Sequence, residues 1–392
     1  MTTPIKVPFL DLKAQYPLIR AEVTRKIDEI IADAAFILGK HVEDFEQAFA
    51  HAHGVRHCLG VSSGTDALHV ALQVLDVGPG DRVIVPVNTF IATAEAVSLV
   101  GAKPVFVDCD ESYNIDPSKV RSALAADRER RIKAIVPVHL YGRPADMTRL
   151  CDVATEFGVA VVEDAAQAHL AEWHNVKVGN FGSLAAFSFY PGKNLGAFGE
   201  AGALVTNDSR LYERAKLFRQ HGEITRYHHV VVGHNYRMEA IQGAVLATKL
   251  KHLPAWTASR RNVAELYRTL LQDVEGIALP PHDADSYSVN HLFVVQSPDR
   301  DALREHLAED GVATALHYPV PLHLQPAYAD LGHRLGDFPV AEAAARKIVS
   351  LPMFPELTKE QIVHVCDSIR AFHAPRWHAL AAPQDQPGRH AW

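Results

Sequence analysis

Residues 183–208 read SLAAFSFYPGKNLGAFGEAGALVTND, and this stretch decides the fold of the chain. Its first part, Leu184 to Tyr190, is apolar and has the length of a buried strand. Pro191 and Gly192 then end the strand, and Lys193 follows in a segment that contains three more glycines. The pattern predicts a strand and a glycine-rich loop that holds a lysine close to the end of that strand.

Lys193 is a candidate nucleophile because of the place where this loop would hold it. A lysine set against apolar walls loses its proton easily, since desolvation disfavours the ammonium, and the free amine can attack an aldehyde. Most lysines are solvated surface residues, so Lys193 alone does not establish catalysis. Neighbouring segments of the sequence carry the rest of the argument.

A second segment, VAVVEDAAQAH at residues 159–169, predicts a short buried strand that ends at Glu163 and Asp164. Ligands bind at the carboxyl ends of parallel strands. A carboxylate there can keep the pyridine nitrogen of pyridoxal phosphate protonated, so that the ring accepts electrons. Asp164 is the candidate, and an ordinary helix N-cap is the alternative. Gln167 could hydrogen-bond the ring oxygen of this cofactor or could be a solvent-facing helix residue.

A third segment, residues 57–75, predicts a strand, a Ser-Ser-Gly-Thr turn and a helix. Such a turn presents backbone N–H groups at a helix N-terminus, where the helix dipole also favours a phosphate. The hydroxyls of Ser63 and Thr65 can add hydrogen bonds. A simple helix cap is the alternative interpretation of the same residues.

An aromatic residue, Phe90, follows a predicted strand at Val83 to Val85 and the strand-ending Pro86. At that place its ring could stack on a flat cofactor. A buried core phenylalanine is the alternative, and it is the more common situation for any single Phe.

These residues closely resemble one family, the pyridoxal phosphate-dependent sugar aminotransferases of the DegT/DnrJ/EryC1/StrS group. The likeness extends along nearly the whole chain, from PFLDLKAQY at residue 8 to LPMFPELT at residue 351. It includes SSGTDAL, VEDAAQAH, FSFYPGKNLGAFGE and GHNYRMEAIQGAVLATKL in this order. The FSFYPGKN segment and HYPVPLHLQPAY at residues 317–328 most resemble enzymes that aminate C3 of a nucleotide-linked 3-keto-6-deoxyhexose.

The resemblance implies an α/β, fold-type I architecture similar to aspartate aminotransferase, with a mainly parallel sheet and pyridoxal 5'-phosphate as the cofactor. It implies that Lys193 binds the cofactor covalently and serves as the catalytic base and acid. It also implies the other cofactor-binding residues: Asp164 at the pyridine nitrogen, Gln167 at the ring oxygen, Phe90 stacked on the ring, and Gly64, Thr65 and Ser188 at the phosphate. Asn235 would reach the phosphate from the neighbouring subunit of a homodimer with shared active sites.

On the substrate side, the resemblance places Tyr190, His317 and Tyr318 against the hexose. Arg226 and Arg260 are candidate cations for the diphosphate of the sugar nucleotide, with surface salt bridges as their alternative. Family members with histidine in place of Lys193 make dehydrated sugars, whereas a lysine permits amino transfer. The implied amino donor is L-glutamate, and dTDP is the expected nucleotide.

Other assignments stay open at the level of sequence. Within the enzyme class the competitor is an aminotransferase for a UDP-linked 2-acetamido 3-keto or 4-keto sugar. Outside that class, a pyridoxal phosphate-binding regulatory protein would usually add a DNA-binding module, and no basic helix-turn-helix pattern precedes residue 55. A catalytically inactive scaffold of the same fold would be expected to lose the lysine or the aspartate, and this chain retains both.

Composition excludes several classes of protein. The chain has 392 residues, 48% of them hydrophobic, which suffices for a large core and a second domain. A formal net charge of -7 gives no general attraction to nucleic acid. The four cysteines lie far apart, which favours neither a zinc site nor a disulfide framework and suits a reducing cytoplasm. No signal peptide or membrane span is expected.

Histidine is abundant, with 23 in the chain, so metal binding has to be considered. The densest group is His221, His228, His229 and His234. It lacks clear cysteine or carboxylate partners at the spacing of a zinc site, so we predict no metal and ordinary solvated histidines.

The expected organisation is a large cofactor-binding domain at residues 1–253, a smaller α+β domain at 254–373 and a flexible tail at 374–392. Alternating strands and helices from about residue 55 to 210 predict a parallel sheet with helices on both faces. The periodicity predicts helices from Leu18 to Ala32, His41 to Ala52, Glu239 to Leu253, Trp256 to Leu271 and Arg300 to Glu309, and strands from Arg82 to Val85, Pro104 to Val107, Ile132 to Val136 and His291 to Val295.

Overall fold

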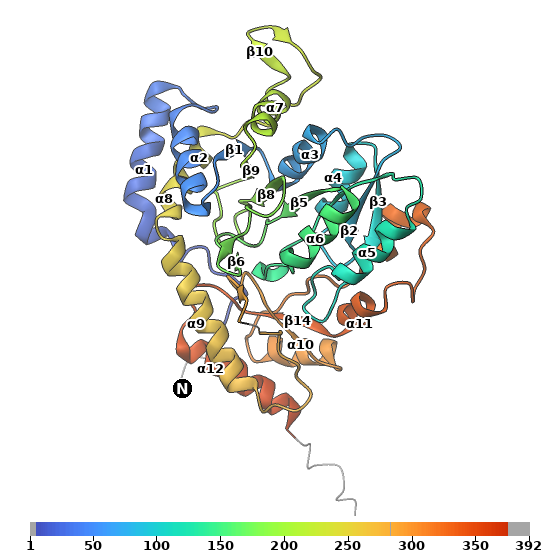
Figure 1. Cartoon of the computed structure of the whole chain (residues 1–392). Helices are drawn as coiled ribbons and strands as arrows, with labels where there is room; N and C mark the ends of the chain where they lie inside the picture. Colours follow the sequence, from blue (N-terminus) through green and yellow to red (C-terminus); the bar gives the residue numbers. More distant parts are fainter. Residues whose placement is uncertain (1–4, 283, 375–392) are drawn as a thin grey trace, which may run out of the picture.

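The computed structural model describes residues 5–282 and 284–374 and is built around one seven-stranded sheet (Figure 1). The strand order is β1-β9-β8-β5-β4-β2-β3. β9 pairs antiparallel with both of its neighbours, and the other strands of this sheet run in one direction. The bounds are β1 His57–Val61, β2 Arg82–Pro86, β3 Lys103–Val107, β4 Ile132–Ile135, β5 Ala160–Asp164, β8 Leu184–Ser188 and β9 Gly202–Thr206. The expected mainly parallel α/β architecture is confirmed.

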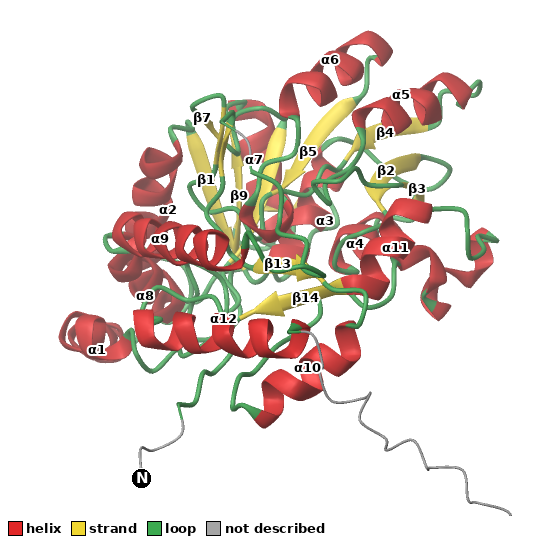
Figure 2. Cartoon of the chain, turned by 90° about the horizontal axis from the view of Figure 1, so that it is seen from below, coloured by secondary structure: helices red, strands yellow, loops and turns green. Residues whose placement is uncertain are grey.

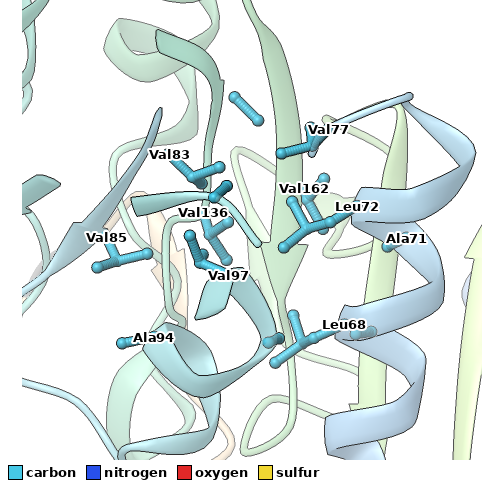
Figure 3. Packing of buried hydrophobic residues seen from close by; sticks show 14 of the residues in the cluster. Leu68, Ala71, Leu72, Val77, Val83, Val85, Ala94, Val97, Val136 and Val162 are labelled. Atoms are coloured by element: carbon cyan, nitrogen blue, oxygen red, sulfur yellow. The ribbon is translucent and has the colours of Figure 1, made fainter. Parts of the chain in front are cut away.

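Helices cover both faces of this sheet, as the alternation of strands and helices predicts. They are α1 Tyr16–Asp33, α2 Lys40–His53, α3 Gly64–Val74, α4 Ala92–Leu99, α5 Pro117–Ala126, α6 Met147–Phe157, α7 Ser209–Arg219 and α8 Ala240–Leu250. Helices α3 and α4 pack on one face, where Leu68 and Leu72 meet Val97 and the sheet residue Val162 (Figure 3). Helices α2, α5, α6 and α8 contribute to the cores on the other face. Successive strand residues point to opposite faces, so both cores draw on the same strands.

The C-terminal part has its own apolar core, below the large sheet in Figure 1. It contains α9 Leu253–Leu271, α10 Arg300–Glu309, α11 Pro339–Lys347 and α12 Lys359–His373, around the antiparallel pair β13 Phe293–Gln296 and β14 Ile348–Leu351 (Figure 2). Short 3₁₀ turns lie at η2 Leu322–Leu324 and η3 Pro326–Leu331. The expected boundary at residue 254 stays a prediction.

The structure differs from the expected helix and strand limits near that boundary. The predicted helix from Glu239 ends at Leu250, and Pro254 lies in the first turn of α9 instead of closing α8. Proline is tolerated there because the first-turn N–H groups have no intrahelical partner. The predicted strand from His291 begins at Phe293. The predicted tail begins at residue 374, and residues 375–392 lie outside the described residues.

The N-terminal residues also depart from the expected division. Val7 is fully buried in the C-terminal core and forms a parallel bridge with Val312. Its N–H donates to Gly311 O at 3.0 Å, and its carbonyl accepts from Ala313 N at 3.0 Å. Main-chain pairing therefore attaches Val7 to the C-terminal part and not to the large sheet.

Short strands form two further features. β6 Glu172–Trp173 pairs with β7 Val176–Lys177 and with β12 Ser286–Tyr287. β10 Glu223–Thr225 and β11 His228–His229 form a hairpin that projects from the top of the body in Figure 1. Ile224, Tyr227 and Val232 on this arm are exposed. In the described part of the chain, no helix is long and apolar enough to cross a membrane.

Candidate active site

Aromatic packing fixes the end of β8, from which the loop of Lys193 departs. The rings of Phe49 and Phe187 meet edge to face, with centroids 5.0 Å apart, and Phe189 lies 5.3 Å from Phe49 and 5.2 Å from Phe45. All four side chains are fully buried. Edge-to-face pairs of this kind add to the stabilisation from burial, so β8 ends at a well-defined place.

Main-chain hydrogen bonds close the loop after β8. Phe189 N donates to Ala201 O at 2.8 Å, and Ala197 N donates to Phe189 O at 2.7 Å. Lys193 N donates to Tyr190 O at 2.8 Å. A Cβ at Gly196 would lie 2.2 Å from Pro191 O, so the loop tolerates no side chain at this position. The glycines that sequence analysis noted thus allow the tight turn that holds Lys193.

Lys193 and Asp164 interact electrostatically at the carboxyl ends of β8 and β5. Burial lowers the pKa of the Lys193 amine to about 8, although the Asp164 charge acts in the opposite direction. Burial raises the pKa of Asp164, and the hydroxyl of Thr93, the N–H of Ala166 and the charge of Lys193 oppose that rise. The pair can therefore hold a carboxylate and a lysine that releases its proton near neutral pH.

The carboxylate of Asp164 is buried and is fixed in position by two hydrogen bonds. Thr93 Oγ1 donates to Asp164 Oδ2 at 2.8 Å, and Ala166 N donates to Oδ1 at 3.1 Å. Asp164 is 5% exposed. The residues directly after Asp164 form turns and not a helix, so the N-cap alternative does not describe this carboxylate.

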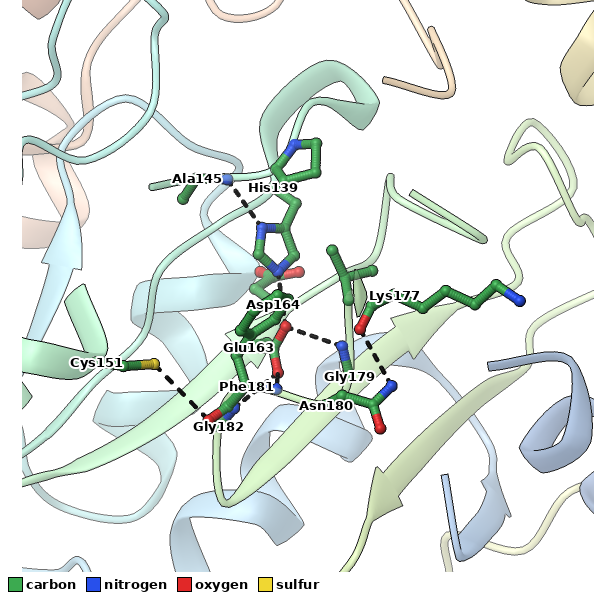
Figure 4. A network of polar contacts seen from close by, with 12 residues as sticks. His139, Ala145, Cys151, Glu163, Asp164, Lys177, Gly179, Asn180, Phe181 and Gly182 are labelled. Atoms are coloured by element: carbon green, nitrogen blue, oxygen red, sulfur yellow. Dashed lines mark hydrogen bonds and ion pairs between the residues drawn. The ribbon is translucent and has the colours of Figure 1, made fainter. Parts of the chain in front are cut away.

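The adjacent Glu163 has a structural role (Figure 4). Its carboxylate accepts hydrogen bonds from Gly179 N at 2.8 Å, Phe181 N at 3.0 Å and Gly182 N at 2.9 Å. It also accepts from His139 Nε2 at 3.0 Å, because His139 Nδ1 is itself the acceptor of Ala145 N. Burial opposes ionisation, but these hydrogen bonds hold the pKa of Glu163 below its usual value. Both carboxylate oxygens of Glu163 already accept hydrogen bonds, so this side chain stabilises the end of β5. Asp164 is the neighbouring carboxylate that remains available to a ligand.

A cradle suited to a phosphate lies where the N-terminus of α3 meets β8. Ser63 caps α3 by accepting Asp66 N at 3.1 Å. A Cβ at Gly64 would lie 2.6 Å from Ser188 Cβ, and a Cβ at Gly202 would lie 2.2 Å from Ser63 O. The first N–H groups of α3, including that of Thr65, have no intrahelical partner and can bind an anion.

On the opposite side of Asp164, a chain of polar contacts leads to the C-terminal part. Gln167 is 5% exposed, which excludes the solvent-facing alternative. Its Oε1 accepts Tyr141 N at 2.6 Å, and its Nε2 donates to Tyr318 OH at 3.3 Å. His317 Nδ1 lies 2.8 Å from Ser350 Oγ. The structure thus brings Gln167, His317 and Tyr318 together.

Two aromatic side chains remain open to solvent beside these residues. Phe90 is 55% exposed, so it is not the core aromatic of the alternative interpretation, and its ring centroid lies 5.8 Å from that of Tyr318. Tyr190 is also 55% exposed, with its N–H 3.3 Å from Ser188 Oγ. Both rings can contact a bound ligand.

Three predicted site residues lie elsewhere. Arg260 is 2% exposed, and its Nη1 donates to Met353 O at 2.9 Å and to His291 O at 3.3 Å. It therefore lies neither at a surface salt bridge nor in a position to meet a diphosphate, because α9 turns this side chain into the protein. Arg226 is exposed on the β10–β11 arm, over the Tyr227 ring. Asn235 is exposed at the base of that arm.

Several residues of the site were not predicted from the sequence. Thr93, at the start of α4, donates a hydrogen bond to Asp164. The only feature of the sequence that could have indicated this role is that Thr93 is a polar residue at the start of a mostly apolar helix. Asn194 directly follows Lys193 and is 3% exposed. His169 and His291 interact electrostatically with Lys193, although they are distant from it in sequence. Among the residues that the structure describes, no group of three or more His, Cys, Asp or Glu side chains could hold a metal ion.

Comparison with known proteins decides the family. The model of the DegT/DnrJ/EryC1/StrS aminotransferase family matches residues 17–370. The chain belongs to this family. The expected aminotransferase activity is thereby confirmed, together with the pyridoxal phosphate chemistry that the resemblance implies.

Relatives of this aminotransferase cover nearly its whole length. A "pleiotropic regulatory protein" of Geobacillus stearothermophilus is 44% identical over 94% of this chain and 99% of its own. The dTDP-3-amino-3,4,6-trideoxy-alpha-D-glucose transaminase of Streptomyces venezuelae is 45% identical over 93% of this chain and 96% of its own. The UDP-N-acetyl-3-dehydro-alpha-D-glucosamine 3-aminotransferase of Acidithiobacillus ferrooxidans is 43% identical over 94% and 99%.

Solved structures agree with the fold of this aminotransferase. DesV of S. venezuelae, in complex with a ketimine intermediate, superposes with a TM-score of 0.91 at 45% identity, covering 95% of this chain and 99% of DesV. NtdA from Bacillus subtilis, with bound cofactor PMP, gives a TM-score of 0.86 at 31% identity, covering 94% and 85%. The expected fold-type I class is confirmed.

The residues of this chain fit pyridoxal phosphate. The cradle between Gly64 and Ser188 has no room for a side chain at Gly64, and the N–H groups at the start of α3 are free to bind an anion. Asp164 is buried, and a buried carboxylate is the usual partner of a protonated pyridine nitrogen. Lys193, whose pKa is lowered to about 8, would supply the amine. These three features occur together at the carboxyl ends of β5 and β8 and the start of α3.

Proposed function

We propose that this aminotransferase moves an amino group from L-glutamate to C3 of a dTDP-linked 3-keto-6-deoxyhexose. The electrostatic pairing of Lys193 with Asp164 carries the amino-transfer part of the proposal. Similarity to the dTDP-sugar transaminase of S. venezuelae supports the nucleotide and the position of amination. The product would be a nucleotide-linked amino sugar.

Pyridoxal phosphate, when bound, supplies an aldehyde and an electron-withdrawing ring that stabilises a carbanion. Asp164 would hold the ring nitrogen protonated, and Thr93 keeps the acceptor oxygen of Asp164 in position. The first N–H groups of α3, with Ser188 and Thr65, would bind the phosphate. The side-chain amide nitrogen of Gln167 has two N–H groups, so beside the hydrogen bond to Tyr318 OH one N–H would donate to the ring oxygen, while Oε1 accepts Tyr141 N.

Lys193 would move the proton of the reaction. An amine with a pKa of about 8 takes up and releases a proton at little cost near neutral pH, as a general base and then a general acid must. Lys193 would carry a proton from the donor's alpha carbon to the cofactor in the first half-reaction and from the cofactor to the sugar carbon in the second. Partial burial of Lys193 in an apolar loop limits competition from water.

The sugar would lie between Tyr190, His317 and Tyr318. Burial raises the pKa of Tyr318 well above its usual range and lowers that of His317 to about 4, so both side chains stay uncharged. Uncharged hydroxyl and imidazole groups suit the hydroxyls of a hexose. Arg226, exposed on the β10–β11 arm, remains a candidate for the diphosphate.

The proposed assembly is a homodimer whose subunits share their active sites, with Asn235 of one subunit at the cofactor phosphate of the other. Exposed apolar residues on the β10–β11 arm support it, because Ile224, Tyr227 and Val232 would be covered by a partner. We also propose that a small C-terminal domain begins at residue 254. The four free cysteines suit a reducing cytoplasm as the site of action.

A UDP-linked 2-acetamido 3-keto or 4-keto sugar is the second candidate substrate. The 43% identity to the UDP-sugar aminotransferase of A. ferrooxidans favours it. Uracil and thymine differ by one methyl group, so the cofactor site serves either substrate equally. A pyridoxal phosphate-binding regulatory role, suggested by the name of the G. stearothermophilus relative, would keep the cofactor site but would not need the substrate-side residues Tyr190, His317 and Tyr318 that this chain retains.

A substrate panel tests the proposal. The protein, loaded with pyridoxal phosphate and glutamate, is incubated with dTDP- and UDP-linked 3-keto and 4-keto sugars, and products are identified by mass spectrometry. We expect a mass change of ketone to amine with the dTDP-linked 3-keto-6-deoxyhexose at the highest kcat/KM. A higher kcat/KM with a UDP-linked 2-acetamido sugar would establish the alternative, and amination of no ketosugar would refute both.

A further inference from the structure

Residues 288–292 lie beside Lys193 and are held there from several directions. Val289 N donates to Gly142 O at 2.9 Å, and Leu292 N donates to Tyr141 O at 3.3 Å. Asn194 Nδ2 donates to Val289 O at 3.1 Å. Hydrogen bonds thus connect this segment both to the loop before α6 and to the residue that follows Lys193 in the chain.

The approach of this segment to the loop is close. A Cβ at Gly142, which has a φ of +87°, would lie 2.8 Å from His291 N and 2.8 Å from Val289 Cγ2. It would also lie 3.1 Å from Gln167 O. Only glycine fits at this position, so the backbone of His291 is fixed relative to Gln167 in the cofactor site.

Asn194 determines which ring nitrogen of His291 carries the proton. Because Asn194 Nδ2 donates to a carbonyl, its Oδ1 is the acceptor, and His291 Nδ1 lies 3.1 Å from that oxygen. Nδ1 therefore bears the hydrogen. Burial lowers the pKa of His291 well below its usual value, so Nε2 carries no proton and the ring is neutral.

Three neutral histidine rings lie close enough to Lys193 to interact with it electrostatically. The charged and titratable groups that interact with it are Asp164 and the three histidines His169, His291 and His317. His169 Nε2 lies 3.0 Å from Ser188 O and must donate to it. Each histidine has a pKa lowered by burial, so none adds a second cation to the surroundings of the lysine.

We propose that Asn194 is a positioning residue for Lys193. Its side-chain amide ties the lysine loop to residues 288–292 and holds His291 as the neutral Nδ1–H tautomer beside the amine. Loss of this amide would release the segment, admit water to Lys193 and weaken the desolvation that lowers the pKa of Lys193. This inference deepens the proposed function and rests on it only for the consequence in catalysis.

The test measures titration of Lys193 in the cofactor-free full-length protein. A trace amine-labelling reagent is applied from pH 6 to 11, and labelling of the Lys193 peptide is followed by mass spectrometry. We expect the midpoint to rise by about one pH unit or more in Asn194→Ala and in His291→Ala, because both truncations open space for water beside the amine. His291→Asn should stay close to wild type, because its amide nitrogen can replace Nδ1 as the donor to Asn194.

A matched control separates positioning from general stability. Asn180 also donates from its amide to two carbonyls, His53 O at 2.9 Å and Lys177 O at 3.1 Å, and these bonds join the segment before β8 to the end of α2. Asn180→Ala should lower the melting temperature while leaving the Lys193 midpoint unchanged. In the loaded enzyme, Asn194→Ala should lower kcat about tenfold or more, with KM for the amino donor within about twofold.

The outcomes are distinct from those of the proposed function. An unchanged Lys193 midpoint in Asn194→Ala and His291→Ala would overturn the inference, even in a protein that aminates sugars normally. A raised midpoint in a protein that aminates no sugar would support the inference and refute the proposed function. An equal rise in Asn180→Ala would show that the effect is general destabilisation and would also overturn it.

Discussion

The hydroxyl of Thr93 donates a hydrogen bond of 2.8 Å to the carboxylate of Asp164, joining the first turn of α4 to the end of β5. Burial raises the pKa of Asp164, and this hydrogen bond is the first of the influences that oppose the rise. Asp164 has to be ionised to hold a protonated ring nitrogen. Thr93 therefore supports the charge state on which the proposed chemistry depends.

Replacing Thr93 tests this relationship through the pH profile. Thr93→Val removes the donor at nearly constant volume, so the pKa of Asp164 should rise further and the acidic limb of the activity profile should move to higher pH. We expect kcat to fall about tenfold or more, since a hydrogen bond to a charged group contributes about 1.5–3 kcal/mol. Thr93→Ser keeps the donor and should restore the profile. An acidic limb that stays in place in Thr93→Val would contradict this role.

Replacing Gly64, at the start of α3, tests the proposed phosphate cradle. In Gly64→Ala, the new methyl group would have to lie 2.6 Å from Ser188 Cβ, which would displace Ser188 from the proposed phosphate cradle. We expect the dissociation constant for pyridoxal phosphate to rise about tenfold to a hundredfold, measured by fluorescence titration. Gly78→Ala is the control, because a Cβ there meets only Val100 O at 3.9 Å. Equal cofactor affinity in both variants would place the phosphate elsewhere.

Arg260 should act on stability and not on substrate binding. Its Nη1 donates to the carbonyls of Asn290, His291 and Met353, and burial lowers the pKa of Arg260 to about 10. Arg260→Met leaves these carbonyls without their donor, and we expect the free energy of unfolding to fall by about 3 kcal/mol in denaturant titration. The exposed Arg226→Met should leave stability unchanged. A loss of substrate affinity in Arg260→Met without loss of stability would restore the diphosphate assignment.

A hybrid-dimer experiment tests the shared active site. If Asn235 serves the cofactor of the other subunit, Lys193→Ala and Asn235→Ala chains are each inactive or nearly so as homodimers. Mixed dimers of the two would contain one complete site, formed by the Lys193 of one chain and the Asn235 of the other. We expect partial recovery of activity after co-expression and purification with two affinity tags. Mixed dimers without recovered activity would place Asn235 in the site of its own subunit.

The parts of the site that sequence patterns predicted are local ones. Asp164 is the last residue of β5, Lys193 and the Ser63–Gly64 turn come shortly after β8 and β1, and the carboxyl ends of parallel strands meet at one edge of the sheet. Pattern therefore suffices to place these residues. Element limits near Leu250 and Pro254 were missed because proline is acceptable in the first turn of a helix as well as after its end.

The parts that were missed depend on contacts between distant segments. Thr93 meets Asp164 across 71 positions of the chain, and His291 meets Asn194 across 97. The environment of Arg260 also arises only when α9 packs on the segments that carry Asn290 and Met353. No periodicity in the sequence encodes such contacts, and an arginine on an amphipathic helix gives no sign that it is buried.

The visible absorbance spectrum of the protein loaded with pyridoxal phosphate tests the central claim, that Lys193 is the lysine of an aminotransferase. Lys249 is the matched control, because it is 4% exposed and its pKa is also lowered to about 8, but it donates to Gly196 O and does not face Asp164. We predict that wild type and Lys249→Met show the band of a cofactor bound covalently to lysine, which glutamate converts to the pyridoxamine form. Lys193→Ala should show neither the band nor turnover. A normal band and normal turnover in Lys193→Ala would contradict the account.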